Sequence, residues 1–206
     1  VCYKSSSPYP GMQIKHFFIF ILVSSSSLLF FYCTSDKAPR QTQSLEYDMI
    51  SVKDSDVKTL IKYDSLGQKL IEGNVINGKK NGSWITYAPG GGIMDITNYI
   101  EDVKQGPYIK LNGGNNIVEQ GSFKDNSLHG QVIKYLYGHL DEKIEFKDGV
   151  KDGWARKYYM HGGLQYEMQV KGEIQQGLYR FYGEDGKLQI EETFKDGKKI
   201  SGGMVH

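Results

Sequence analysis

The sequence has few cysteines, few prolines and no surplus of either charge. Its 206 residues include two cysteines, Cys2 and Cys33, too few for a disulfide framework or a zinc site built from CxxC pairs. Residues 1–32 hold two lysines and no acid, so the rest of the chain carries 23 basic and 24 acidic residues. Nucleic-acid binders normally show a basic excess or a basic stripe. The sequence therefore predicts no disulfide scaffold, no metal site and no nucleic-acid partner.

Sequence signatures of catalysis are also missing. The five histidines are scattered without metal-ligand spacing, and no phosphate-binding loop, nucleophile elbow or zinc-protease helix occurs. We therefore expect no enzyme, no catalytic residue and no cofactor. One alternative stays open, because two carboxylates could act as acid and base on a glycan, although charged residues on a sheet are usually just solvated. The carboxylate pairs are Glu101/Asp102, Asp141/Glu142 and Glu191/Glu192.

The longest apolar run lies near the start of the chain. Residues 17–32 read FFIFILVSSSSLLFFY and follow Met12 and Lys15, which is the layout of an export signal. The run falls short of the ~20 residues of a comfortable membrane-spanning helix. We predict an export signal or membrane segment at 12–32, and we interpret 1–11 as upstream, non-native sequence. A buried core helix is the alternative.

The apolar run ends at Cys33 and so resembles a bacterial lipoprotein signal, in which the cysteine is lipidated and becomes the first mature residue. The family pattern has a small residue before the cysteine, whereas this chain has Tyr32. Lipidation of Cys33, an uncleaved anchor and ordinary secretion all stay open. Each places the remainder of the chain outside the cytoplasm. The resemblance implies a location in the cell envelope, at the outer membrane or the periplasmic face.

A polar segment follows the signal. Residues 33–56 show neither strand alternation nor a helical stripe, so we predict a tether between the membrane and the folded part. Within it, 45–52 could form one weak element, and a first strand is the alternative.

The rest of the chain is periodic and rich in glycine. Of 25 glycines, all but Gly11 lie at or after Gly67. Glycines that open short aromatic runs recur every 23–24 residues, and so do two series of mostly aromatic residues. The opening glycines are Gly82, Gly106, Gly130, Gly153 and Gly177. The first series is Tyr63, Tyr87, Leu111, Tyr135, Tyr158 and Tyr182, and the second is Val75, Tyr99, Phe123, Phe146, Val170 and Phe194.

Each period contains two strand-like runs separated by turn signals such as Asn77-Gly78 and Asp148-Gly149. Because 24 residues leave no room for a helical crossover, the pattern predicts an all-β, elongated antiparallel meander of about five and a half hairpins over 57–206. Stacked hairpins would place each series in one row, with neighbouring members about two strand spacings apart.

The repeat resembles the bacterial variant of the MORN-repeat family. The matching stretches are Asn77-Gly-Lys-Lys-Asn-Gly-Ser-Trp-Ile-Thr-Tyr87, Phe146-Lys-Asp-Gly-Val-Lys-Asp-Gly-Trp154 and Phe194-Lys-Asp-Gly197. The second and third units depart from the pattern, with Asp102-Val103 and Asp125-Asn126 near the turn. The resemblance implies a β-hairpin repeat that binds or scaffolds. Some bacterial members are labelled antitoxins, and phospholipid binding has been proposed for the wider family.

We expect a non-enzymatic, membrane-tethered module that mediates protein or envelope interactions outside the cytoplasm. An antitoxin or immunity protein and a glycan-binding or glycan-acting protein are the alternatives. The candidate binding residues form an aromatic platform or, alternatively, part of the core, and they are Trp84, Tyr108, Trp154 and Tyr179.

Overall fold

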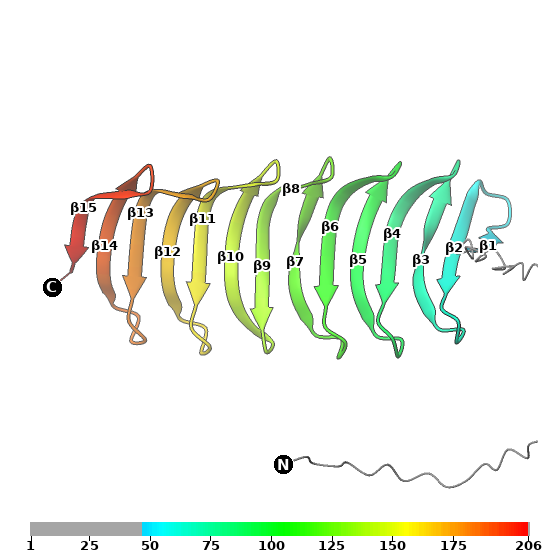
Figure 1. Ribbon diagram of the computed structural model, residues 1–206, viewed down its shortest axis with the longest axis horizontal. Coiled ribbons are helices and arrows are strands. Elements are labelled where there is room, and N and C mark those ends of the chain that lie inside the picture. The colour runs from blue at the N-terminus through cyan, green and yellow to red at the C-terminus, as the bar shows by residue number, and fades with distance from the viewer. Residues whose placement is uncertain (1–46, 206) are drawn as a thin grey trace, which may run out of the picture. The chain divides into compact units, whose positions relative to one another are not determined.

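The computed structural model describes residues 47–205, and every regular element among them is a β-strand (Figure 1). The predicted signal and Cys33 lie outside the described residues. The strands are β1 (Asp48–Ser51), β2 (Val57–Tyr63), β3 (Lys69–Ile76), β4 (Lys79–Tyr87), β5 (Ile93–Ile100), β6 (Val103–Leu111), β7 (Ile117–Lys124), β8 (Ser127–Leu128), β9 (Gly130–Leu136), β10 (His139–Lys147), β11 (Val150–Tyr158), β12 (Leu164–Lys171), β13 (Ile174–Tyr182), β14 (Leu188–Lys195) and β15 (Lys198–Met204).

All strands belong to one antiparallel sheet. Each pairs with its neighbours in sequence, except that the two-residue strand β8 pairs only with β7, and β7 continues to β9. This confirms the predicted meander. The sheet also includes β1, which falls inside the segment predicted as a tether and pairs with β2 from Asp48↔Ile61 to Ser51↔Lys58. Residues Asp48–Ser51 of the predicted 45–52 element therefore form a strand, and the sheet begins before residue 57.

The strand register assigns the two periodic series to opposite faces of the sheet, because side chains alternate along a strand. Face A is the face of Trp84, and face B is the face of Tyr135. The series that begins at Val75 lies on face A, and the series that begins at Tyr63 lies on face B. Members of a series occur on every second strand, about 10 Å apart. The predicted rows are therefore present, one on each side of the sheet.

Most of the buried side chains lie on face A. Of the eight buried apolar residues, only Ile61 is on face B. A central row on face A crosses the sheet through directly paired positions, and its members are Leu60, Gly73, Trp84, Thr97, Tyr108, Gly121, Val132, Ile144, Ala155, Met168 and Tyr179. Large and small residues alternate along its first half. The indole of Trp84 covers Gly73, and the ring of Tyr108 covers Gly121.

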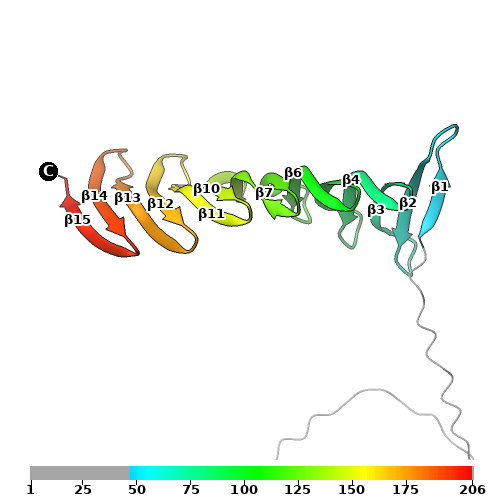
Figure 2. The same cartoon turned by 90° about the horizontal axis from the view of Figure 1, so that it is seen from above.

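The opening glycines produce bulges. Where β4 pairs with β3, the register skips from Asn74↔Asn81 to Gly73↔Trp84, so Gly82 lies in the extra length of β4. All five opening glycines have positive φ, between +77° and +123°, which a side chain would disfavour. Bulges bend strands, and the strands are bowed when the sheet is viewed from above (Figure 2).

Two-residue turns form one long edge of the sheet, at the top of Figure 1. Glu101-Asp102 and Asp125-Asn126 have positive φ at both residues, like Asn77-Gly78. The units without a turn glycine therefore keep the same turn. The second turn residue also reaches the preceding hairpin, since the amide of Asp102 donates to the Lys80 carbonyl at 3.0 Å and that of Asn126 to the Lys104 carbonyl at 3.1 Å.

Candidate interaction surfaces

The four aromatic candidates do not form one platform. Trp84 and Tyr108 are 4% and 2% exposed on face A, so they belong to the core of the sheet. Trp84 donates from Nε1 to the Asn74 carbonyl at 3.1 Å, and the Tyr108 hydroxyl donates to Glu119 at 2.9 Å. Their polar atoms are therefore used inside the sheet.

The other two candidates lie on opposite faces. Tyr179 is half-buried on face A and meets Phe194 edge-on, with ring centroids 6.4 Å apart. Trp154 pairs with Gln169 on face B, where its backbone amide donates to Glu145 at 2.9 Å and the Arg156 guanidinium lies 5.2 Å from its ring. The structure thus separates Trp154 from the other three.

On face B, the directly paired residues in the middle of the strands are apolar in one part of the sheet and charged in another. Isoleucines occupy these positions in β4, β5 and β6, whereas a chain of ion pairs occupies them from β11 to β14. Glu167 contacts Arg156 at 3.2 Å and Arg180 at 3.4 Å, and Arg180 also contacts Glu191 at 2.7 Å. The Glu167 side chain is only 12% exposed, so these contacts are less screened than ordinary surface pairs. We did not predict this network, although both arginines and both glutamates recur 24 residues apart.

Tyrosine hydroxyls on face B bind polar side chains that lie 15 residues earlier. Tyr87 donates to Glu72, and Tyr182 donates to Glu167 at 3.3 Å, while Tyr135 accepts from Gln120 Nε2 at 2.9 Å. Burial and the hydrogen bond to Glu72 raise the pKa of Tyr87 to about 12. Hydrogen bonds from Lys69 and Tyr87 in turn lower the pKa of Glu72. These pairs fix the tyrosine rings along the face.

Face A carries a row of alternating charges beside its core. Lys110 contacts Glu119 at 2.8 Å, Lys134 contacts Glu142 at 3.1 Å, and Lys157 contacts Glu142 at 3.4 Å. Burial would raise the pKa of Glu142, but the hydrogen bond from Lys134 and the charges of both lysines outweigh it and lower the pKa. Opposite charges on directly paired residues stabilise neighbouring strands.

A hollow on face A lies above Ala155. At the equivalent position of other repeats, Trp84, Tyr108 and Tyr179 have aromatic rings. Ala155 has only a methyl group, which leaves a depression of about 330 Å³. Its floor is formed by Ile144, Phe146, Ala155, Met168 and Val170. The ion pairs Lys134–Glu142 and Lys151–Glu173 border it, so each cation at its rim already has an anionic partner.

The carboxylate pairs also have partners within the sheet. Glu101 contacts Lys79 at 3.2 Å, and Asp102 accepts from the Lys80 amide at 2.8 Å. Asp141 and Glu142 share Lys157. Glu191 and Glu192 are neighbours in β14 and so point to opposite faces, where they contact Arg180 and Lys199 respectively.

Among residues 47–205, no three His, Cys, Asp or Glu side chains are grouped as a metal site would require. The same part of the chain contains no helix long and apolar enough to cross a membrane. Comparison with models of known protein families finds no match, and comparison with curated proteins finds none.

Proposed function

We propose that this chain is a non-enzymatic, MORN-like repeat module, held at a membrane outside the cytoplasm by its N-terminal segment, which binds envelope components or proteins. One observation carries the binding role. The hairpins form a single uninterrupted sheet, and the register repeats the same kinds of side chain at regular intervals along it. Such an arrangement gives a long surface with equivalent positions, which suits an extended partner.

The N-terminal sequence supports the proposed location at a membrane. The apolar run 17–32 and Cys33 precede the sheet in sequence, and an acyl group on Cys33 would anchor the chain, because each buried CH₂ contributes about 0.8 kcal/mol to membrane binding. The sheet begins at Asp48, so 14 residues separate it from Cys33. Fully extended, they would span at most about 45–50 Å. The sheet would therefore work close to the membrane.

The first test is metabolic labelling with radioactive palmitate of the full chain and of Cys33→Ala. We expect label in the wild type alone, together with a shift of Cys33→Ala from the membrane fraction to the soluble fraction. Cys2→Ala is the matched control and should be labelled like the wild type. Equal labelling of wild type and Cys33→Ala would refute lipid attachment at this residue.

A further inference from the structure

Three lysines form a row on face A of the first three hairpins. Lys58 in β2 and Lys80 in β4 both pair with Val75 in β3, and Lys104 in β6 pairs with Tyr99 in β5. They occupy the same position on every second strand, next to the edge with the two-residue turns. Neighbouring lysines are therefore about 10 Å apart along the long direction of the sheet.

Aromatic rings hold two of these ammonium groups in place. The Nζ of Lys80 lies 4.3 Å from the ring centroid of Trp84 and 4.9 Å from that of Tyr99, and the Nζ of Lys104 lies 5.0 Å from that of Phe123. A ring face attracts a cation without neutralising it. Because these contacts already order the long side chains, binding an anion would cost less conformational entropy.

The positive charge of this row is not matched by ion pairs. Within residues 47–205, no acid forms an ion pair with Lys58, Lys80 or Lys104. Farther along the same row, Lys151 contacts Glu173 at 2.9 Å and Lys199 contacts Glu192 at 2.6 Å. The row is thus paired at its C-terminal end and unpaired at its N-terminal end.

The acids near these three lysines do not form ion pairs with their ammonium groups. Glu101 contacts Lys79 at 3.2 Å, and Asp102 accepts from the backbone amide of Lys80 rather than from its ammonium group. Asp56 lines the same shallow depression as Lys58 without forming an ion pair to it. The three ammonium groups are thus free to meet an external anion.

We propose that this lysine row binds an acidic polysaccharide with one anionic group per disaccharide, extended across the strands. In a β-linked chain of this kind the anions recur at about the length of a disaccharide, which is close to two strand spacings. Phosphates of an extended nucleic acid are closer together, so they would not coincide with successive lysines. The inference rests on the proposed function and names the partner class for one face.

The test measures binding of the full chain to hyaluronan oligosaccharides, which carry one carboxylate per disaccharide, by isothermal titration calorimetry at low salt. The triple variant Lys58→Gln, Lys80→Gln, Lys104→Gln should bind at least about tenfold more weakly, since three charge contacts are lost. The matched control makes the same change in charge on the other face, at exposed lysines of the same edge. It is Lys124→Gln, Lys147→Gln, Lys171→Gln, and it should bind like the wild type.

Two further variants separate binding from folding. Lys58→Gln, Lys104→Gln leaves Lys80 on its rings and should still weaken binding several-fold. Lys80→Arg keeps the positive charge in the row, so it should bind more tightly than the triple variant. Far-UV circular dichroism checks each variant. An equal loss in the control triple variant, or no binding of hyaluronan by the wild type, would overturn the proposal.

Parallel titrations use neutral chitin oligosaccharides, single-stranded DNA and phosphatidylserine vesicles. Tighter binding of DNA or vesicles that depends on the same lysines would also overturn the polysaccharide assignment, in favour of those ligands. Palmitate labelling of the triple variant distinguishes this inference from the proposed function. A wild type that takes up palmitate but does not bind hyaluronan would refute the inference alone, whereas a triple variant that is labelled normally but no longer binds hyaluronan would support it.

Discussion

Gly73→Ala tests the packing of the sheet directly. A Cβ at Gly73 would lie 2.5 Å from Cγ of Trp84, far inside van der Waals contact, and the backbone of Gly73 is not in the left-handed region. The clash is therefore the main destabilising effect of the substitution. Trp84 is 4% exposed and directly paired with Gly73, so the indole must move out of the core to admit a methyl group.

The size of the effect can be bounded. Overpacking a core typically costs about 1–3 kcal/mol, and losing a buried Trp side chain altogether costs about 3–5 kcal/mol. Displacement of the indole also breaks its hydrogen bond to the Asn74 carbonyl, which contributes about 1 kcal/mol. We expect the free energy of unfolding to fall by about 2–4 kcal/mol, a decrease in Tm of roughly 5–15 °C for a domain of this size.

The assay is thermal and urea unfolding of the full chain, followed by far-UV circular dichroism and tryptophan fluorescence. Gly113→Ala is the matched control, because a Cβ there meets nothing within 4 Å and its φ is also outside the left-handed region. It should change stability by no more than about 1 kcal/mol. If Gly73→Ala is as stable as Gly113→Ala and its fluorescence spectrum is unshifted, the ring does not lie on this glycine.

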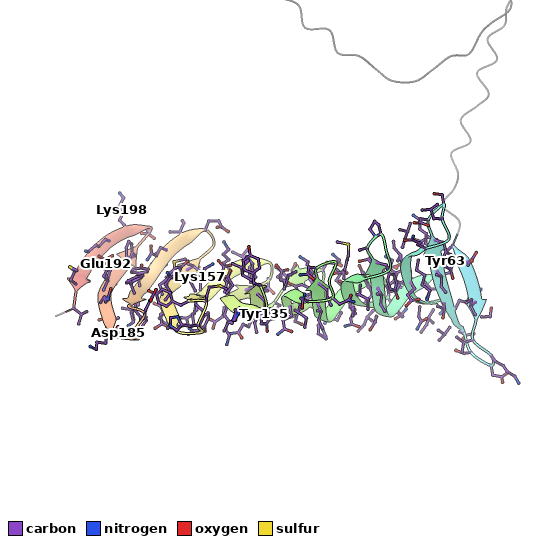
Figure 3. The ribbon with its side chains drawn as sticks, turned by 90° about the horizontal axis from the view of Figure 1, so that it is seen from below. Tyr63, Tyr135, Lys157, Asp185, Glu192 and Lys198 are labelled. Atoms are coloured by element: carbon purple, nitrogen blue, oxygen red, sulfur yellow. The ribbon has the colours of Figure 1, made fainter. Side chains whose placement is uncertain are left out.

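Two other predictions concern the tyrosines of face B. Tyr135→Ala removes a ring from the middle of the sheet, together with its hydrogen bond to Gln120, and should lower the free energy of unfolding by about 2–4 kcal/mol (Figure 3). Tyr63→Ala, near the end of the sheet, should lower it less, because Tyr63 is 37% exposed. Equal decreases in Tm would contradict stacking of the hairpins. The pKa of Tyr87 is raised to about 12, so the stability that its pairing with Glu72 gives is present below about pH 10 and is lost as the pH rises through about 12. At the acid end, the lowered pKa of Glu72 means that its contribution is present above about pH 4.5 and fades as the pH falls through that lowered value. Urea unfolding across the pH range checks both contributions. Tyr87→Phe should reduce the alkaline loss of stability without abolishing it, because other tyrosines, Tyr108 among them, also have a raised pKa. An alkaline slope identical to that of the wild type would refute the role of Tyr87.

The period of the sequence was sufficient to predict the meander, because two strands and two turns fill 24 residues and the opening glycines recur in register. The faces were harder to predict. Trp84 lies two residues after Gly82, whereas Trp154 lies one residue after Gly153, and this single-residue offset places the two indoles on opposite faces. Counting from each glycine would have separated them.

Other features depend on contacts that a linear pattern does not reveal. All four residues of β1 are exposed, so no alternation marks this strand, which exists because β2 offers it a free edge. The Glu101-Asp102 turn has no glycine, yet the carboxylate of Asp102 and the amide of Lys80 hold it in place. The lysine row also became visible only when register showed which lysines share a face and which have acidic partners.

The turn-to-turn hydrogen bonds suggest how chains of this kind change length. From the Glu101-Asp102 turn onward, one residue of each two-residue turn donates to the equivalent carbonyl of the hairpin before it, as Asp102 does to Lys80 and Asn126 does to Lys104. Gene duplication or deletion of one whole 24-residue unit would preserve these bonds and leave every row on its original side. Loss of one strand would instead reverse the direction of all later strands and bring mismatched edges together. Selection would therefore lengthen or shorten this molecule in whole-hairpin increments of about 10 Å.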